Sequence, residues 1–537
     1  MGSIGSGASG VYVTIRDYSG FSRQALKGFV MMEGVCVRGP VNKATLCSDY
    51  DEFQQTFGGL HSTYDFPYLV KRAMSYGARV VVNRIAHYED PADPTTLTAT
   101  RGEATLVDRA DPAKSTLGIT AINEGAWSGK IKWTVTDGTI NPSTEFNITF
   151  RNDSDAHVTP ETYQNASMDP SAANYILKLV NGVSKIVTLA ELGDGTDYAE
   201  RRPATGTGYL SEGDDGLEDL NANDYIGDEA AGLGLYSFDE IDYSMLLSVP
   251  ECIELDSPGP EAVQAAVTTY CSEHRLKMVY GINAIPLGLT PSEARDYRNG
   301  VSPSYTPIND WTQGIFYGDI SVLDPRTGTS LTYVNPLGDV CGAIARGHSD
   351  RREWFPVAGW RYSLLHDVYG IRYNLAPVGK RGQADILADA QVNMIVSDES
   401  GAYIDGMATM QRAASTLSNE TTAWLMMVIK KALYKYGRGY LYLPIGPSTW
   451  QLMANELDPW LAGLKGDYGF YAYDLQCDQY APDIYNGKLN KPETIEQGIL
   501  YAQIAIKPTS WSKWVGFTVS LTKLTAKFED FETLSLV

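Results

Sequence analysis

Residues 79–85 read RVVVNRI, with three consecutive valines in a continuous run that fits an extended chain. Such a run predicts a buried strand of a parallel sheet, because strands covered on both faces are rich in β-branched residues. The residues before it fit the same unit. A buried strand is predicted at 28–31. One helix is predicted to begin at 49–53, with acidic residues in its first turn, and to end at 57–59, and a second helix is predicted at 68–76. Residues 26–86 are therefore predicted to be compact α/β.

A second α/β pattern follows later in the chain. Its predicted elements are helices at 262–274 and 291–298 and strands at 277–282 and 314–322.

The stretch between the two patterns, from about 90 to 250, has a different composition. Asp, Asn, Thr, Ser and Gly increase, strands alternate as in 130–135, and 194–229 is strongly acidic and Gly-rich. This composition predicts an inserted β-rich domain with long exposed loops. Residues 219–223 begin like a calcium-binding loop, but Asp224 and Ala230 stand where the motif needs Gly and Glu. An EF-hand is excluded, and looser calcium binding by the acidic loop stays open.

The chain turns to longer helices after about residue 386. The longest predicted helix, 418–436, has basic residues toward its C-terminal end: Lys430, Lys431, Lys435 and, just beyond it, Arg438. Cations there complement the helix dipole, which is the simplest explanation. However, residues 421–450 contain no Asp or Glu in a chain that is otherwise acidic. This contrast predicts a cationic surface facing an anionic partner.

Both ends of the chain contain candidate strands for pairing outside their own domain. Residues 1–10 are Gly-rich and form a flexible tether for the predicted strand Val11, Tyr12, Val13, Thr14 and Ile15. That strand either leaves its domain or forms an edge strand within it. Near the C-terminus the apolar residues alternate and then change phase at Leu524, which indicates a bulge or a change of packing surface. The alternating residues are Val515, Phe517, Val519 and Leu521.

Composition excludes several classes of protein. The 537 residues include 65 acidic and 43 basic side chains, a net charge of −22, which excludes a general nucleic-acid binder. The six cysteines lack C-x-x-C spacing, so buried, reduced thiols are expected and no zinc site or cofactor. No apolar stretch of 18 residues and no signal peptide occur, which predicts a protein made and kept in a cytoplasm. The six histidines are scattered and no nucleophile or phosphate-binding motif fits, so we expect no enzyme.

Several stretches, in order along the chain, resemble the contractile tail sheath proteins of bacteriophages and related injection machines. Residues 10–15, GVYVTI, are similar to the sheath entry strand, and 38–43, RGPVNK, are similar to a turn of that family. Residues 405–410, DGMATM, depart from it, because many sheaths have a G-x-R-T-like motif there. The other similar stretches are 28–30, 51–59, 77–85, 125–129, 161–163 with 167–170, 224–227, 319–320 with 324–325, 340–346, 469–478, and 505–508 with 517–519.

The resemblance implies a multidomain α/β (α+β) fold with a sheath-type inner domain, extended terminal strands and a β-rich inserted outer domain. The implied division is an N-terminal arm at 1–20, a middle α/β domain at 21–90 with 250–385, an outer domain at 91–249 and a tube-facing inner domain at 386–537.

The implied function is that of a structural subunit. Copies polymerise as hexameric rings around a tail tube and contract to drive the tube through the host envelope. In the family, the terminal strands add to a neighbour's sheet. The implied partners are other copies, the tail tube protein, and baseplate and tail terminator or neck proteins, without nucleic acid or membrane insertion. The implied location is the virion tail, assembled in the host bacterial cytoplasm.

Two other classes of protein remain as alternatives. A soluble enzyme with a dispersed site would form a discrete small oligomer and be indifferent to loss of residues 1–15. Another virion component, such as a surface or baseplate protein, would not form tubes alone. Within the sheath hypothesis, a phage-derived bacteriocin or another contractile injection system is the alternative to a phage.

Overall fold

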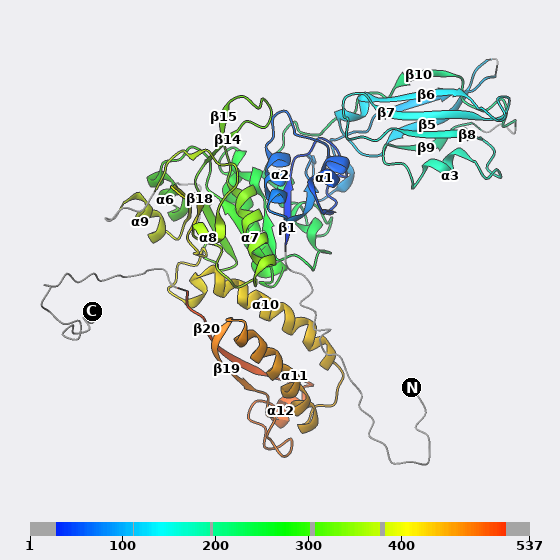
Figure 1. The fold of residues 1–537 in the computed structure, drawn as a ribbon. Coiled ribbons are helices and arrows are strands. Elements are labelled where there is room, and N and C mark those ends of the chain that lie inside the picture. The colour runs from blue at the N-terminus through cyan, green and yellow to red at the C-terminus, as the bar shows by residue number, and fades with distance from the viewer. Residues whose placement is uncertain (1–27, 111, 194–196, 301–306, 376–381, 512–537) are drawn as a thin grey trace, which may run out of the picture. The chain divides into compact units, whose positions relative to one another are not determined.

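The computed structural model describes residues 28–110, 112–193, 197–300, 307–375 and 382–511 (Figure 1). The chain divides into two compact units, Met1–Leu443 and Pro444–Val537. The predicted terminal strands, at 11–15 and 515–521, lie outside the described residues.

The first unit is built on an eight-stranded sheet with the order β18-β17-β13-β12-β11-β1-β3-β2. Central strand β1 pairs in parallel with β3 on one side and with β11 on the other. Strands before and after the inserted residues therefore share one sheet, and the mixed α/β class is confirmed. The strands are β1 (Phe29–Gly34), β2 (Thr45–Cys47), β3 (Arg79–Arg84), β11 (Leu246–Ser248), β12 (Tyr280–Ala284), β13 (Gln313–Tyr317), β17 (Asn393–Asp398) and β18 (Gly401–Asp405).

The helices that the sequence predicts are found close to their predicted places, and the structure has further helices that were not predicted. Most of the helices pack on the sheet because their apolar residues join one core with the central strands, in which Val80, Val81 and Val82 are fully buried, whereas residues 291–299 and 383–389 join a second core. A π-turn, Tyr270–His274, continues α5. The helices are α1 (Tyr50–Phe57), α2 (Phe66–Ser75), α4 (Ala222–Ile226), α5 (Gly259–Thr269), α6 (Pro291–Asn299), α7 (Leu337–Asp350), α8 (Trp360–Ser363), α9 (Gln383–Asp389) and α10 (Glu420–Gly437).

The prediction of a single strand at 314–322 is wrong, because the strand is interrupted at Gly318. Residues before the break form β13 in the large sheet, and residues after it form β14 (Ile320–Leu323) in a separate sheet with β15 (Leu331–Val334) and β16 (Gly370–Ile371). Gly318 has φ +133°, and a Cβ there would lie 2.9 Å from Ile395 Cβ. Only glycine fits that backbone and that contact, so the apolar run cannot continue straight.

The inserted residues form two antiparallel sheets with a core of their own. One has the order β10-β6-β7-β8 and the other β4-β5-β9. Alternate residues such as Ile131 and Val135 of β6 are buried between them, as the alternation of 130–135 predicts. The elements are β4 (Glu103–Val107), β5 (Ser115–Ala121), β6 (Ile131–Asp137), β7 (Phe146–Asn152), β8 (Glu161–Ala166), α3 (Ile176–Val180), β9 (Val187–Glu191) and β10 (Gly206–Tyr209).

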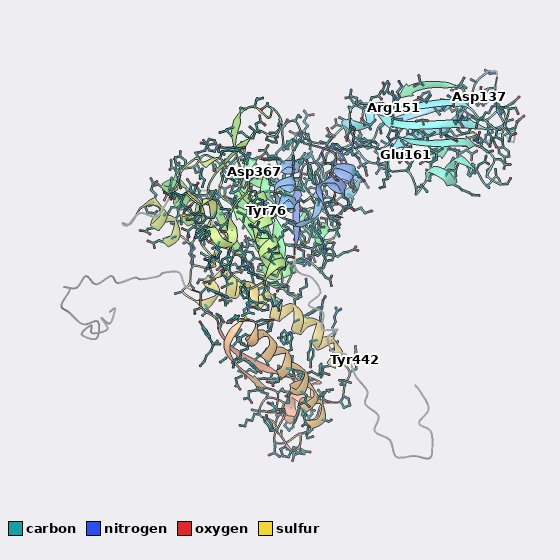
Figure 2. The ribbon with its side chains drawn as sticks, in the orientation of Figure 1. Tyr76, Asp137, Arg151, Glu161, Asp367 and Tyr442 are labelled. Atoms are coloured by element: carbon teal, nitrogen blue, oxygen red, sulfur yellow. The ribbon has the colours of Figure 1, made fainter. Side chains whose placement is uncertain are left out.

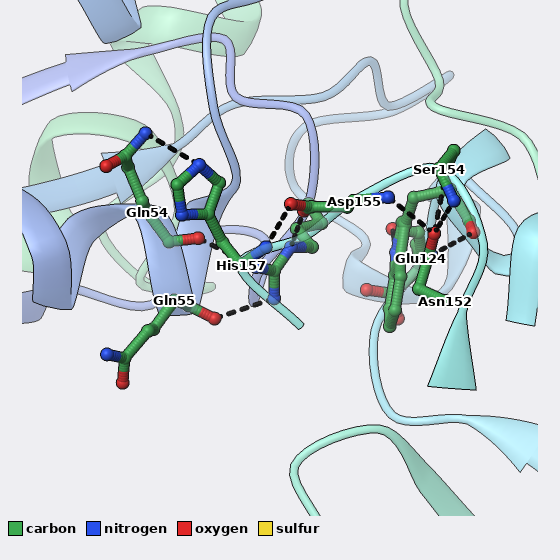
Figure 3. A network of polar contacts seen from close by, with 9 residues as sticks. Gln54, Gln55, Glu124, Asn152, Ser154, Asp155 and His157 are labelled. Carbon is green, nitrogen blue, oxygen red and sulfur yellow. Dashed lines mark hydrogen bonds and ion pairs between the residues drawn. The ribbon is translucent and has the colours of Figure 1, made fainter. Parts of the chain in front are cut away.

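Arg38 joins the inserted residues to the end of helix α1, and Figure 3 labels its partners Gln54, Gln55 and Asp155. Its guanidinium donates to the carbonyls of Gln55 and Gln54 at 2.6 and 2.7 Å and to Asp155 Oδ2 at 3.1 Å. Cations are favourable at a helix C-terminus, where carbonyls lack intrahelical partners. Trp127 lies under the guanidinium, 5.7 Å from ring centre to Cζ. One buried arginine therefore caps α1 and anchors the inserted domain.

Strands β17 and β18 pair within the large sheet, through β13. Residues 393–405 thus join strands of the predicted middle domain, although the predicted inner domain begins at 386. Residue 443 is where the compact units divide. The four-part domain division itself stays a prediction.

Candidate assembly site

The described residues of the second unit form a sheet of two strands. β19 (Phe470–Gln476) pairs antiparallel with β20 (Gln503–Pro508), with a bulge between Phe470 and Ala472. Among the residues that the structure describes, no strand pairs with the outer edge of either. Two open edges in one small sheet present rows of unpaired N–H and C=O groups, which is the geometry that accepts added strands.

This sheet is covered on one face by α11 (Pro447–Gly466). Trp450 and Leu461 of the helix and Phe470 of β19 are buried, whereas Ile504 and Ile506 of β20 are only half-buried. Among the described residues, these two apolar side chains of β20 therefore stay partly uncovered. The remaining short helix of this unit is α12 (Pro492–Glu496).

Helix α10 is anchored to the large sheet through its first two turns. Trp424 is fully buried against Tyr280 and His348, with ring centroids 5.7 and 4.8 Å away. The carboxyl of Glu420 accepts from Tyr280 Oη at 2.7 Å and from Asn393 Nδ2 at 3.1 Å. The buried first half of the helix therefore fixes the direction in which its basic second half extends (Figure 1).

The four predicted tube-facing cations do not form one uniform surface. Lys431 is half-buried and donates to the backbone carbonyl of Asp242, and Lys435 lies 3.4 Å from the Asp242 carboxylate. Burial lowers the pKa of Lys431 to about 8. Lys430 and Arg438 are exposed, and Arg438 stacks on Tyr434 with its Cζ 5.0 Å from the ring centre. Asp242, an acid from a distant part of the chain, thus pairs with cations of the acid-free stretch 421–450.

An apolar tip follows the basic helix, and sequence reasoning did not identify it. Leu441, Tyr442 and Leu443 are 62%, 103% and 40% exposed. Figure 2 labels Tyr442 beyond the end of α10, where its backbone has φ +66°. The run GYLYLP, directly after a basic helix, is the sequence signal that could have revealed it. Tyrosine and leucine beside cations are typical of a protein contact surface.

In the acidic loop considered above for calcium binding, Asp224 makes contacts within its own chain. Asp224 is buried, caps α4 by accepting from the Asn221 amide at 2.9 Å, accepts from the Tyr88 amide at 3.0 Å and pairs with His87 at 3.0 Å. Across the described ranges, no group of three or more His, Cys, Asp or Glu could hold a metal ion.

The helices that can be described include none long and apolar enough to cross a membrane.

Solved structures match this architecture over most of its length. A sheath tail protein of Listeria innocua superposes with a TM-score of 0.57 at 11% identity, covering 84% of this chain and 89% of that one. A sheath tail protein of Desulfitobacterium hafniense matches with a TM-score of 0.50 at 12% identity, covering 87% and 94%. The chain has the fold of a contractile tail sheath protein. The sheath fold also matches the contracted helical sheath of the anti-feeding prophage, with a TM-score of 0.51 at 11% identity over 96% of this chain and 99% of that chain.

The match to known proteins comes from comparing structures. No protein-family model and no curated protein sequence matches this chain. At 11 to 12% sequence identity, what this chain shares with the matched structures is the arrangement of helices and strands.

The buried Glu420 carboxyl predicts a pH dependence of stability. Burial raises its pKa to about 8, although hydrogen bonds from Tyr280 and Asn393 act in the opposite direction. The folded chain thus holds a proton that the unfolded chain releases above about pH 4.5, so stability is fully present below that pH and falls as pH rises toward 8. Between pH 6 and 8 we expect a loss of about 2 to 3 kcal/mol.

Urea unfolding at pH 6, 7 and 8 measures this loss. Glu420→Gln cannot ionise and should reduce the wild-type loss by about 2 to 3 kcal/mol, whereas the exposed Glu240→Gln should leave the wild-type slope unchanged. Equal pH slopes for wild type and Glu420→Gln would contradict the assignment.

Proposed function

We propose that this chain is the structural subunit of a contractile tail sheath. Its copies assemble as hexameric rings around a tail tube in the host bacterial cytoplasm, and contraction drives the tube through a host envelope for genome ejection. The partners are other copies, the tail tube protein, and baseplate and terminator or neck proteins of the virion tail. The sheath fold supports this function, together with the similarity to structures of the helical sheath and the baseplate of the anti-feeding prophage.

The open two-stranded sheet is the observation that carries the proposal. Two-stranded sheets are marginally stable alone, so β19 and β20 are suited to receive further strands. The predicted donors are residues 11–15 and 515–521 of neighbouring copies. At about 0.5 to 1.5 kcal/mol net per backbone hydrogen bond, one added strand contributes a few kcal/mol. Repetition at every copy makes the links multivalent, so a mesh persists while subunits rotate.

The sheath of a bacteriocin or another injection system is the second candidate. Similarity to the anti-feeding prophage sheath across 96% of the chain favours it. Particles purified from the producing bacterium distinguish the two: tails joined to DNA-filled capsids indicate a phage, and free tails without DNA indicate an injection system.

Negative-stain electron microscopy of the purified chain, alone and co-expressed with a tail tube protein from the same source, tests the proposal. We expect hollow, striated tubes in at least one of the two preparations. Discrete small particles in both would contradict a sheath function and favour the enzyme alternative.

The basic end of α10 is the proposed tube contact. Reversing Lys430 and Arg438 to Glu should reduce tube-templated assembly about tenfold or more, because the tube face would become anionic, with the subunit still folded. Lys431 is unsuitable for this test, since its charge contacts its own chain. The matched control reverses two exposed lysines of the inserted domain, Lys114 and Lys185, for the same change in net charge. Sedimentation of sheathed tubes measures assembly, and normal sheathing by the first variant would refute the tube contact.

A further inference from the structure

The parallel part of the large sheet has a topological switch point at β1. The chain goes from β1 to β3 on one side of it and later adds β11, β12 and β13 on the other. In open α/β sheets, ligands bind outside the carboxyl ends of the two strands that flank such a point. In this chain those ends are Gly34 of β1 and Ser248 of β11.

A side chain of the protein occupies that position. Glu251, three residues after β11, is 1% exposed. Its Oε2 accepts from the Val35 amide at 2.8 Å, and its Oε1 accepts from the Phe66 amide at 2.8 Å. Val35 follows β1, and Phe66 begins the ten-residue helix α2. Both donors are therefore backbone N–H groups of the kind that bind anionic ligands at the switch points of other α/β sheets.

The surroundings are closed and acidic. A Cβ on Gly34 would lie 2.8 Å from Glu251 Oε2, so no side chain fits between the strand end and the carboxylate. Glu33 is fully buried, and in the described part of the chain its Oε1 has no hydrogen-bond partner. Burial raises the pKa of the Glu251 carboxyl, and the nearby Glu254 carboxyl adds to the rise, whereas the hydrogen bonds from the Val35 and Phe66 amides lower it.

We propose that the Val35 and Phe66 amides form an anion site at the switch point and that Glu251 is its built-in ligand. The site has room for a small carboxylate. In the intact chain the side-chain carboxyl of Glu251 occupies it. This inference concerns the middle of the large sheet and is independent of the proposed sheath function. If Glu251 is this ligand, it connects the ends of β1 and β11 to the start of α2. It does so at the position where other α/β sheets bind a free ligand.

The size of the site follows from the side chain. Glu251→Ala removes one methylene and the carboxylate, which together have the non-hydrogen atoms of acetate. Acetate should therefore refill the vacated space and accept from both amides. Formate is one carbon smaller and should act more weakly, whereas propionate is one carbon too large. Acetamide has the shape of acetate, but its NH₂ would face an N–H donor and leave it unsatisfied.

Thermal unfolding of the full chain tests the proposal, with sodium acetate compared to sodium chloride at equal ionic strength. We expect Glu251→Ala to melt below wild type and acetate to raise its Tm selectively. With a Kd of about 10 mM, 100 mM acetate would increase the folded-to-unfolded ratio about 11-fold. Wild type should show no selective effect. Equal effects of acetate and chloride on Glu251→Ala, or equal acetate effects on both proteins, would overturn the proposal.

A second variant keeps the proposal testable if Glu251→Ala does not fold. Glu251→Gln has the same shape, but its NH₂ must face one of the two amide donors. We expect it to be clearly less stable than wild type and insensitive to acetate, because no space is vacated. Wild-type stability of Glu251→Gln would overturn the assignment of Glu251 as a bound anion.

Discussion

Deletion of residues 1–15 is expected to abolish polymerisation while the subunit still folds. The deletion removes the predicted strand at 11–15 and its tether, so one open edge of the β19–β20 sheet would lose its partner in every copy. Because the links are multivalent, losing one per copy should reduce the yield of tubes by a factor of about 100 or more. Sedimentation and electron microscopy measure the polymer, and circular dichroism measures the fold.

A single residue separates strand pairing from other roles of the arm. Val13→Pro removes a backbone N–H and should block strand addition, whereas Val13→Thr keeps the backbone donor and the β propensity. We expect tubes from Val13→Thr and none from Val13→Pro. Tubes from both variants, or from the deletion, would refute strand exchange by this arm.

Asp339→Ala is expected to destabilise the first unit by about 3 to 5 kcal/mol, because it leaves a buried arginine without its counter-ion. Asp339 Oδ2 and Oδ1 accept from Arg72 Nε at 2.6 Å and Nη2 at 2.7 Å, and Tyr76 Oη donates to Oδ1 at 2.8 Å. Arg72 also donates to the His366 carbonyl at 2.7 Å. The pair joins α2, α7 and a distant loop, so its loss affects three segments. Urea unfolding followed by tryptophan fluorescence measures the change.

An exposed ion pair of the same kind provides the control for this prediction. Asp339 is fully buried, whereas Asp296 pairs with Arg295 at 2.6 Å with both side chains 39% exposed. Asp296→Ala should therefore cost under about 1 kcal/mol. In a double-mutant cycle, adding Arg72→Ala to Asp339→Ala should recover part of the loss, since the uncompensated charge is removed. Equal costs for Asp339→Ala and Asp296→Ala would contradict a buried, coupled pair.

Much of the fold follows from local patterns in the sequence. The helix predicted at 418–436 is α10, and the strand predicted at 79–85 is β3, because apolar periodicity reflects the side chains that the core must bury. The break at Gly318 could not be predicted from that periodicity, since the reason for it is Ile395, which is distant in sequence. Pairing of β17 with β13 is likewise a long-range contact without a local signal.

The candidate site could be predicted only in part. The acid-free stretch indicated exposed cations, and Lys430 and Arg438 are exposed. Lys431 and Lys435 instead contact Asp242, which lies nearly 190 residues away in sequence, so no local pattern could show it. The open edges of β19 and β20 depend on which strands do not pair, which periodicity does not report. The strands at 11–15 and 515–521 remain predictions.

Cryo-electron microscopy of the assembled tubes tests the central claim most directly, because it shows which strands flank β19 and β20. We predict a four-stranded sheet in which residues 11–15 of one neighbouring copy and 515–521 of another pair with the two outer edges. A sheet completed by strands of the same copy, or edges left unpaired in the polymer, would contradict strand exchange as the link between subunits.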